Sequence, residues 1–441
     1  MSATPRAPSM SPQLQSVASM ARNDPSLRFQ TLAHRIDPDA LRRAYDRLDG
    51  QAAVGVDGIT KAEYGQCLEE NLRTLHARLR AGTYRHQPIR RVHIPKAPGE
   101  TRPLGISSLE DKIVQGALRE VLEAIYEQDF LPCSFGFRPG RSAHDTLRAL
   151  DRAVFVRGAS VILEADVKSF FDSVDRKALM EMLRERIADE SFLRLVGKCL
   201  HVGVLDGEEF STPDRGVVQG SVLSPLLGNV YMHHVLDRWF EHTVKPRLRG
   251  HAQLLRYADD FVVAFERRDD AERVLAALGQ RMERFGLTLH PEKTRLVAFH
   301  QPDRGPAGGE PPETFDFLGF TVLWRKTRKG GWTVGFKTRR ARLRRAIVSV
   351  TEFCRRQRHD PVKQQHAQLC RRLRGHLNYF GVNGNMRSLE RLLNEARRTW
   401  RKWLDRRSQR ARMTWERFQQ LLERFPLPRP VIRVQLWART T

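Results

Sequence analysis

The stretch LLRYADDFVVAF (residues 254–265) places two adjacent aspartates between two apolar arms. Apolar runs of this length that meet at a polar centre are typical of two buried strands joined by a tight turn. Adjacent carboxylates repel each other and are costly to bury, so the turn needs a compensating cation. The sequence therefore predicts a β-hairpin with Asp259 and Asp260 at its turn. Mg²⁺ is the natural cation, because hard divalent ions prefer carboxylate oxygens.

A third carboxylate is available upstream. The run VILEADV (residues 161–167) has the pattern of a strand that ends at Asp166, and such a strand can lie beside the hairpin in one antiparallel sheet. Shared carboxylates can place two metal ions roughly 4 Å apart across an in-line phosphoryl displacement. A single aspartate at a strand end is more often a turn or cap residue. The prediction of a metal site therefore rests on the three aspartates together.

The rest of the chain alternates between helical and strand patterns. The first 25 residues are rich in Ser, Pro and Ala, which is typical of a flexible tail, so order is expected to begin near Ser26. Ser224 followed by Pro225 indicates a helix with Ser224 as its N-cap, continuing to about Trp239. Other expected elements are helices at 41–48, 63–79 and 108–126, a basic hairpin at 89–106, a loop at 133–141, strands at 295–299 and 315–324, and helices after residue 337.

Charge is the first functional indication from composition. The 441 residues include 76 Lys plus Arg and 51 Asp plus Glu, a formal net charge of +25. A protein this basic is drawn to polyanions, of which nucleic acid backbones are the commonest, although a solubility charge is the alternative. From Lys337 to Arg412 there are 23 basic and 5 acidic residues, which is 23 − 5 = +18. The polyanion site is therefore expected to be partly C-terminal.

Size and cysteine content narrow the class of protein further. A chain of this length is expected to form two or three subdomains. The five cysteines are far apart and lack CxxC or Cys/His ligand spacing, which argues against a disulfide framework or a zinc site. No apolar run approaches the roughly 20 residues needed to span a bilayer, and the N-terminal segment lacks the apolar core of a secretory signal. A cytoplasmic protein without a membrane partner is expected.

Several motifs resemble those of one family. Tyr257-Ala258-Asp259-Asp260 resembles the YxDD box of reverse transcriptases, and DVKSFF (166–171) resembles their first catalytic motif. The further boxes follow in the family's order: PLGI (103–106), FGFRPGRS (135–142), QG (219–220) continuing into SPLL (224–227), LHPEKT (289–294), FLGF (317–320) and LRGHLNYF (373–380). The chain thus resembles the group II intron-encoded reverse transcriptases and maturases from about residue 30 to about residue 425.

This resemblance implies an α+β right-hand polymerase fold, with fingers, a palm built on an antiparallel sheet and a helical thumb or maturase domain. It divides the chain into a tail at 1–25, fingers at 26–155, a palm at 156–336 with an inserted fingers segment at about 185–215, and a basic thumb at 337–441. No Cys/His cluster or His-Asn-His-like segment follows the thumb, so the DNA endonuclease domain of some relatives is expected to be absent.

The resemblance also implies roles for the metal site. Asp166 and Asp259 would bridge two Mg²⁺ ions, for which Mn²⁺ is a substitute. Asp260 would support them, and the backbone carbonyl of Val167 would also coordinate. Phe171 matches the aromatic steric gate that favours deoxynucleotides, with an ordinary core phenylalanine as the alternative.

Contacts to nucleotide and RNA are implied in the same way. The residues that match nucleotide-binding positions are Lys96, Arg102, Gln219, Gly220 and Lys293; Lys96 and Arg102 match contacts to the triphosphate, with a phosphate clamp on the template as the alternative. Arg138 and Arg141 are expected to contact the template unless their loop is structural. Arg374 and Asn378 belong to the thumb motif that grips intron RNA.

Two features qualify this picture. The family's usual Thr-Pro-Gln-Gly-Gly is here Val217-Val218-Gln219-Gly220-Ser221, so the nucleotide pocket differs in its flanking residues. Trp400, Trp403 and Trp415 lie among arginines and can stack on bases, but their helical spacing favours packing. His376 is expected to be structural.

The predicted function is an RNA-directed DNA polymerase of a group II intron, with a maturase role in binding and splicing intron RNA and in retromobility. Its expected partners are an intron RNA template, a DNA primer or target, and dNTPs; the sequence leaves the oligomeric state open. The alternatives are an RNA-binding splicing factor whose polymerase activity is secondary or lost, and a domesticated or defence reverse transcriptase. A viral RNA polymerase is disfavoured by Phe171 and by the Tyr-Ala-Asp-Asp form of the box.

Overall fold

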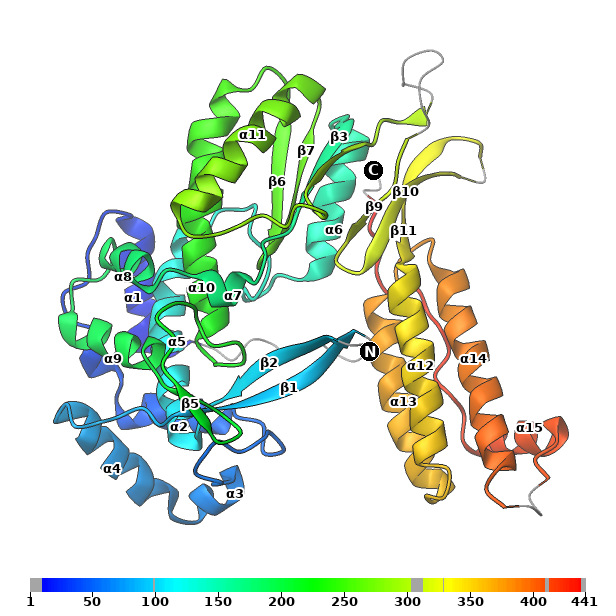
Figure 1. The fold of residues 1–441 in the computed structure, drawn as a ribbon, viewed down its shortest axis with the longest axis horizontal. Coiled ribbons are helices and arrows are strands. Elements are labelled where there is room, and N and C mark those ends of the chain that lie inside the picture. Colours follow the sequence, from blue (N-terminus) through cyan, green and yellow to red (C-terminus); the bar gives the residue numbers. More distant parts are fainter. Residues whose placement is uncertain (1–9, 98–99, 303–311, 328, 409–411, 438–441) are drawn as a thin grey trace.

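The computed structural model describes residues 10–97, 100–302, 312–327, 329–408 and 412–437. These residues form an α+β fold with three β-sheets and many helices (Figure 1). The hairpin β1/β2 extends from the N-terminal helices toward a bundle of long C-terminal helices, and a four-stranded sheet with helices on both sides lies above the hairpin in this view. The predicted α+β right-hand architecture is confirmed.

The N-terminal part is organised around the helix α5 (Leu109–Asp129), most of which is buried. The helices α1 (Pro12–Asn23) and α2 (Pro38–Asp46) both pack against α5, and α2 also contacts α4 (Leu68–Arg80). Shorter elements complete this part: η1 (Ala33–Arg35), α3 (Lys61–Tyr64) and η2 (Gly65–Cys67). The predicted helices at 41–48 and 108–126 are confirmed with shifted ends, whereas the single helix predicted over 63–79 is divided into α3, η2 and α4.

The prediction of a flexible tail over residues 1–25 is wrong where α1 forms; residues 1–9 lie outside the described part of the chain. The side chain of Ser11 accepts a hydrogen bond from the N–H of Leu14, and Pro12 occupies the first turn, so the helix has a regular start. Apolar side chains recur every three or four residues and are buried: Leu14, Val17, Ala18 and Ala21. Composition suggested a tail, but this spacing gives an amphipathic helix.

The basic hairpin is confirmed as β1 (Ile89–Ala97) and β2 (Glu100–Ile106), paired antiparallel. Residues far along the chain complete its sheet, whose order is β2-β1-β4-β5. The strand β4 (Val204–Asp206) runs parallel to β1, and β5 (Glu209–Ser211) pairs antiparallel with β4. The helices α8 (Arg176–Arg184) and α9 (Glu190–Leu200) precede β4 and carry the chain back to this sheet.

The second sheet has the order β6-β7-β3-β8, all antiparallel. Its strands are β3 (Val161–Ala165), β6 (Ala252–Tyr257), β7 (Asp260–Phe265) and β8 (Arg295–Ala298). Side chains alternate between two cores: Phe261, Val263 and Phe265 of β7 belong to one, and Val262 and Ala264 to the other. Burial on both faces explains why β7 is continuously apolar.

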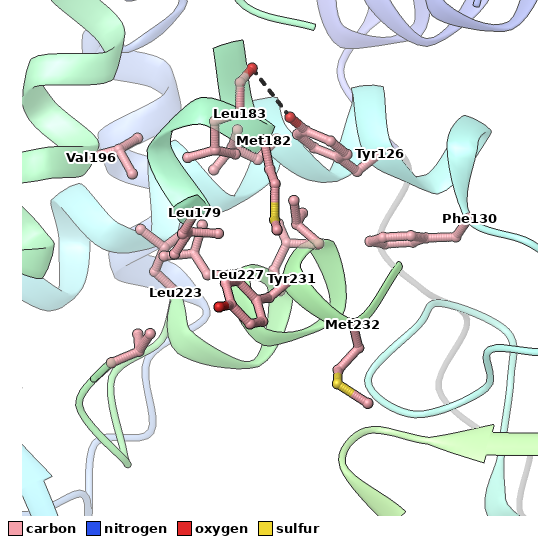
Figure 2. Packing of buried hydrophobic residues seen from close by; sticks show 14 of the residues in the cluster. Tyr126, Phe130, Leu179, Met182, Leu183, Val196, Leu223, Leu227, Tyr231 and Met232 are labelled. Carbon is pink, nitrogen blue, oxygen red and sulfur yellow. Dashed lines mark hydrogen bonds between the residues drawn. The ribbon is translucent and has the colours of Figure 1, made fainter. Parts of the chain in front are cut away.

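The larger of these cores joins the N-terminal helices to the sheet. Figure 2 shows side chains from α5, α8, α9 and the helix α10 (Ser224–Met232) converging in it, with Leu183 and Met182 beside Tyr126. The hydroxyl of Tyr126 donates to the carbonyl of Leu183 at 3.4 Å, which satisfies a polar atom inside an otherwise apolar cluster. The helix α11 (Arg268–Arg284) covers the same face of the sheet.

The helix that begins at Ser224 differs from the prediction at both ends. Ser224 is its first residue and not its N-cap, because the Ser224 hydroxyl donates to the carbonyl of Val218 at 2.7 Å. After Met232 the chain continues as two π-helical segments, His233–Asp237 and Phe240–Val244, before the 3-10 turn η6 (Lys245–Arg247). Such wide turns in a helix often mark functional sites.

The third sheet leads into the long C-terminal helices. Its strands are β9 (Phe315–Phe317), β10 (Phe320–Lys326) and β11 (Trp332–Thr338), in the order β11-β10-β9. The single strand predicted over 315–324 is wrong, because Leu318 and Gly319 both have positive φ values and form a turn between β9 and β10.

The remaining helices are α6 (Ala143–Asp151), η3 (Arg152–Val156), α7 (Phe170–Ser173), α12 (Arg340–Arg356), α13 (Val362–Tyr379), α14 (Met386–Asp405) and α15 (Trp415–Arg424). The long helices α12, α13 and α14 lie side by side (Figure 1). Among the described helices, none combines the length and apolarity that a membrane crossing requires.

The packing of α1 can be tested by truncating a core side chain. Leu14→Ala is expected to lower the free energy of unfolding by about 2–4 kcal/mol, because Leu14 is buried against the rest of the N-terminal core. Urea unfolding followed by circular dichroism measures the change. Ser19→Ala, at an exposed position of the same helix, is the control. A Leu14→Ala protein as stable as wild type would show that α1 is not docked.

Candidate active site

The turn of the β6/β7 hairpin presents the two adjacent aspartates. Tyr257 pairs with Asp260 in the antiparallel register, which leaves Ala258 and Asp259 as a two-residue turn. Ala258 has a φ of 59°, in the left-handed region that the favoured two-residue hairpin turns require. The predicted hairpin is therefore confirmed, with Asp260 as the first residue of β7.

Asp166 emerges from the neighbouring strand at the same edge of the sheet. Ala165 of β3 pairs antiparallel with Phe261 of β7, so the residue after Ala165 lies beside the residue before Phe261. The main chain at Asp166 is held in place, because its carbonyl accepts from the N–H of His290 at 2.8 Å. The predicted placement of Asp166 beside the hairpin in one antiparallel sheet is confirmed.

Lys293 lies against the first of these carboxylates. Its Nζ donates to Oδ2 of Asp166 at 2.6 Å, and more than half of the lysine side chain is exposed. Lys293 follows His290 in a turn closed by a hydrogen bond from its own N–H to the His290 carbonyl. The segment that fixes the Asp166 backbone thus also supplies a cation to its side chain.

The acids at the turn are electrostatically strained. Burial raises the pKa of Asp259 above its ordinary value, and the charge of Asp166 adds to the rise, while Arg102 and Arg256 oppose it. Removal from water raises the pKa of Asp260 to about 6, and the charges of Asp259 and Asp166 act in the same direction. Asp260 itself lies at the surface of the protein.

This set of residues fits divalent ions by its donor chemistry and its charge. Carboxylate oxygens are the ligands that hard divalent cations prefer, and a cation would relieve the repulsion that raises the two pKa values. As they stand, no three His, Cys, Asp or Glu side chains of the described residues are gathered closely enough to hold an ion. The carboxylate of Asp166 instead accepts a hydrogen bond from Lys293, whose ammonium group acts as its counter-ion.

A buried arginine supports the turn from below. Arg256 of β6 is fully buried and forms an ion pair with Asp237 of the first π-helical segment, with its Nε 2.7 Å from Oδ1 and an Nη 2.5 Å from Oδ2. The other guanidinium hydrogen bonds reach Asn229 of α10 at 2.9 Å, the hydroxyl of Ser134 at 2.8 Å and the carbonyl of Ala258 at 3.0 Å. The turn between β6 and β7 is therefore tied to three other segments by one side chain.

The loop at 133–141 packs against the same turn. A Cβ added at Gly136 would lie 2.4 Å from the backbone nitrogen of Ala258, so only glycine allows this approach. The carbonyl of Gly136 accepts from the side-chain amide of Asn229 at 2.7 Å. Phe137, which follows, has a φ of 57° and a ring that is 51% exposed near Tyr257.

The expected template contact at Arg138 is wrong. Its side chain is buried, and its guanidinium donates to the carboxylate of Glu127 and to the carbonyls of Leu131 and Ser134. These bonds close the loop and leave the side chain no access to a nucleic acid. Arg141 is partly exposed and donates to the carbonyls of Pro132 and Ser134, so it too helps to hold the loop.

Three of the residues expected at the nucleotide, Arg102, Gln219 and Gly220, lie together at β2. Nε of Arg102 on β2 donates to the side-chain oxygen of Gln219 at 2.9 Å, and the N–H of Gly105 donates to the Gln219 carbonyl at 2.6 Å. Gly220 has a φ of 103°, and a Cβ there would lie 2.5 Å from the Gly105 carbonyl. The structure thus docks the Gln-Gly box on β2, with Arg102 close enough to lower the pKa of Asp259.

Phe171 ends the 166–171 motif that begins with Asp166, and its side chain is half-buried. Its ring packs edge-on against the buried Phe170, with centroids 5.2 Å apart, and its carbonyl accepts from the N–H of Val217 at 2.7 Å. Gly228 of α10 leaves room for both rings. Phe171 is therefore neither a fully buried core residue nor a free surface residue.

Other expected contact residues lie elsewhere. Lys96 belongs to β1, but its side chain is outside the described part of the chain. Arg374 and Asn378 are exposed on α13, and no contact between them and the three aspartates is formed among the described residues. Burial lowers the pKa of His376 to about 4, and its ring packs on Phe380, as expected of a structural histidine.

The tryptophans separate into packing and surface positions. Trp400 is fully buried and donates to the side-chain oxygen of Gln365 at 3.0 Å. Trp415 on α15 is 49% exposed, and the guanidinium of Arg401 lies over its ring. Packing is thus confirmed for Trp400, whereas Trp415 retains an accessible ring.

Sequence reasoning missed several residues that shape the site. Arg256 was visible as a charge inside an apolar strand, which is a signal for a buried partner. Its partner Asp237 had no such signal, because the π-helical register that places it is not readable from spacing. Arg342 and Lys293 both lower the pKa of Asp260. Arg342 lies in the first turn of α12, 342 − 265 = 77 residues after the end of the hairpin, so only the fold reveals that proximity.

Comparison with known proteins agrees with this geometry. A family model described as reverse transcriptase (RNA-dependent DNA polymerase) matches residues 94–322. Protein YkfC of Escherichia coli (strain K12) is 33% identical over 370 residues, which cover 76% of this chain and 94% of YkfC. The group II intron-encoded protein LtrA of Lactococcus lactis subsp. cremoris is 36% identical over 203 residues, which cover 46% of this chain and 33% of LtrA.

More distant similarity extends to a retrotransposon. The retrovirus-related Pol polyprotein from the type-1 retrotransposable element R2 of Nasonia vitripennis is 27% identical over 269 residues, covering 56% of this chain and 26% of that protein. The chain therefore spans nearly all of YkfC but a third or less of LtrA and of the R2 polyprotein.

The support that Arg256 gives the turn can be tested by breaking its ion pair. Arg256→Leu would leave the Asp237 carboxylate buried without its partner, and it is expected to lower the free energy of unfolding by about 3–5 kcal/mol. Urea unfolding monitored by tryptophan fluorescence gives the value. The double variant Arg256→Leu/Asp237→Leu should recover part of the loss, because neither charge remains uncompensated. If the Arg256→Leu variant were as stable as the wild-type protein, the buried ion pair between Arg256 and Asp237 would be contradicted.

The raised pKa of Asp260 predicts a pH-dependent stability in protein stripped of divalent ions. Asp260 ionises near pH 6 when folded and near 3.8 when unfolded, so its contribution to stability is lost as the pH rises through this window. Asp260→Asn should therefore be more stable than wild type above pH 6, by about 1 kcal/mol because solvent screens the exposed group. The difference should vanish toward pH 4.

Thermal unfolding in EDTA at several pH values measures this difference. Asp46→Asn, at an exposed position at the end of α2, serves as the matched control and should follow the wild-type curve. Parallel curves for wild type and Asp260→Asn across the whole range would show that Asp260 is not strained in the folded protein.

Proposed function

Since the chain belongs to the reverse transcriptase family, in the branch that includes proteins encoded by group II introns, we propose that it copies RNA into DNA at Asp166, Asp259 and Asp260. The family match runs from β1 to β10 and contains all three aspartates. Enzymes of this family use divalent metal ions, an RNA template and a nucleic acid primer. The observation that carries the proposal is the strand register that places Asp166, Asp259 and Asp260 at one edge of the sheet, where burial and neighbouring charges raise the pKa values of Asp259 and Asp260.

We propose Mg²⁺ as the ion, with Mn²⁺ as a substitute. Asp166 and Asp259 would hold two ions with support from Asp260, and the Val167 carbonyl would add an oxygen ligand. When bound, these ions activate the primer 3′-hydroxyl and neutralise the charge of the departing pyrophosphate. Lys293 would then release Asp166 and keep its positive charge beside the phosphates of the nucleotide.

The residues around the carboxylates orient the incoming nucleotide. Arg102 is held by Gln219, so its guanidinium is available at a fixed place for a phosphate, and Lys96 of the same hairpin would add a second cation. Gln219 and Gly220 would shape the pocket from the other side. Phe171, half-buried next to Phe170, would crowd a ribose 2′-hydroxyl and so favour dNTPs.

The division of the chain follows the sheets. We propose fingers from α1 to about residue 155 together with about 185–215, because β4 joins the sheet of β1 and β2. The palm would comprise the remaining residues from 156 to 336, built on the sheet that carries the aspartates. The thumb would begin at about residue 337, just before α12, and run to the C-terminus.

A maturase role is proposed from the thumb and from the relatives. LtrA is named as a group II intron-encoded protein, and the thumb of this chain carries much of its excess positive charge. Binding of intron RNA would be driven by phosphate neutralisation and weakened by salt. Arg374 and Asn378 are exposed on α13 and would contribute to that grip, and splicing and mobility of the intron would follow from it.

The polymerase assignment is tested by primer extension. Asp259→Ala is expected to lower DNA synthesis on an RNA template with dNTPs and Mg²⁺ by more than about 1,000-fold, because positioning of the ions supplies most of the rate. Its affinity for RNA should change little, since phosphate contacts elsewhere dominate binding. Gel analysis of extended primers and a filter-binding assay measure the two quantities.

Asp46→Ala, at an exposed aspartate far from the hairpin in the chain, is the matched control and should extend at the wild-type rate. Wild-type protein that binds RNA but makes no DNA would overturn the proposal and favour a splicing factor that has lost polymerase activity. Loss of RNA binding in Asp259→Ala would contradict the separation of the catalytic and RNA-binding surfaces.

A further inference from the structure

A cavity lies on the sheet of β1, β2, β4 and β5, apart from the aspartates. Its volume is about 490 Å³, and it opens between the end of α9, the segment before β1 and the strand β5. Aromatic and basic side chains line it, including Tyr84, Arg85, Lys198, His201 and Phe210. None of the described residues that line the cavity is acidic. An aromatic wall with a basic rim favours a ligand that is both flat and anionic.

Phe210 forms an exposed platform at the mouth of this cavity. Its ring is 60% exposed, although it lies on β5 within a sheet. A Cβ added at Gly203 would lie 2.2 and 2.3 Å from two carbons of the ring. The edge of the ring, at Cζ and Cε2, therefore abuts the glycine backbone, and the absence of a side chain at Gly203 leaves room for it there. Because the contact is made by the ring edge and Phe210 is largely exposed, a ring face can accept a planar group.

The basic rim is partly fixed and partly free. Nζ of Lys198 donates to the carbonyls of Gly82 at 3.1 Å and Tyr84 at 2.6 Å, which holds one positive charge at the wall. Arg85 is exposed and forms no hydrogen bond or ion pair with the described residues. The exposed His201 completes the rim. Nδ1 of His201 lies 3.0 Å from the Gly197 carbonyl, so its Nε2 is the ring nitrogen left to meet a ligand. A phosphate at the mouth would meet Arg85 without displacing another partner of that guanidinium.

The cavity is connected to the catalytic site through the sheet. The N–H of Ile89 on β1 donates to the carbonyl of Gly203 at 2.8 Å, and β2, on the other side of β1, docks on Gln219. Because neighbouring strands are about 4.8 Å apart, the edge strand β5 lies on the order of 15 Å from β2. An extended polynucleotide that leaves the nucleotide pocket can span this distance.

We propose that this cavity binds a nucleotide of single-stranded RNA template that has not yet been copied, with its base stacked on Phe210 and its phosphate near Arg85 and His201. Stacking on an aromatic ring beside cations is the usual way in which proteins hold single strands without reading their sequence. The proposal rests on the proposed function and deepens it, because it assigns the template a path across the fingers that ends at a defined surface.

The test compares primer–template duplexes with a short and a long single-stranded 5′ extension of the template. Fluorescence anisotropy measures the affinity of full-length protein for each. Phe210→Ala is expected to weaken binding of the long-extension duplex about tenfold, as for loss of one base stack, and to leave the short-extension duplex unchanged. Phe210→Trp should retain wild-type affinity, since it preserves the stacking face.

Gly203→Ala offers a second route to the same loss, because its Cβ would displace the ring without removing it. In the Phe210→Ala background this substitution should have no further effect, since the two act through one ring. Phe155→Ala is the matched control: Phe155 is a phenylalanine 44% exposed on η3, outside this sheet.

The outcomes separate this inference from the polymerase assignment. The proposed template platform would be overturned if Phe210→Ala protein bound both duplexes with wild-type affinity. It would also be overturned if the substitution lowered the affinity for both duplexes by the same factor. DNA synthesis on the short-extension duplex should proceed in wild type and in Phe210→Ala alike. If wild type fails to extend it, the polymerase proposal fails, while the binding comparison still decides whether the single strand uses Phe210.

Discussion

The hydrogen-bond network of the Arg256 guanidinium is the interaction on which the turn between β6 and β7 depends. The guanidinium lies with no solvent exposure in the middle of the core, paired with Asp237 and bonded to Asn229, Ser134 and the carbonyl of Ala258. A charge in this position is tolerated only because every donor finds an acceptor. The same requirement fixes the turn that carries Asp259 and Asp260, since moving the turn would break the network.

The four-stranded sheet extends this constraint to the third aspartate. Its strands bury side chains on both faces, in two separate cores, so a shift of register by one residue would exchange every side chain between cores of different shape. The pairing of Ala165 with Phe261 is therefore strongly specified, and Asp166 follows at the edge beside Asp260. Packing of apolar residues thus determines where the acids meet.

The sequence revealed those parts of the fold that leave a local pattern. Alternation and turns identified the hairpins at 89–106 and 254–265, and motif spacing identified the three aspartates. The composition of residues 12–23 suggested a flexible tail, which was wrong, because a few apolar residues at helical spacing outweigh an excess of Ser and Ala. Arg138 resembled a template contact, but its partners Glu127, Leu131 and Ser134 are known only once the loop is closed. Long-range partners of this kind leave no periodic signal.

The cations near the active site differ in how firmly they are held, and this difference suits them to different tasks. Arg256 is enclosed and paired, so its charge is part of the scaffold. Lys293 reaches Asp166 on a flexible, largely exposed side chain, and ion pairs with exposed partners contribute little to stability. Arg102 is steadied by Gln219, a neutral partner that leaves its charge uncompensated. A fixed positive charge can hold the acids in place, whereas a weakly held one can leave them when divalent ions and a triphosphate arrive.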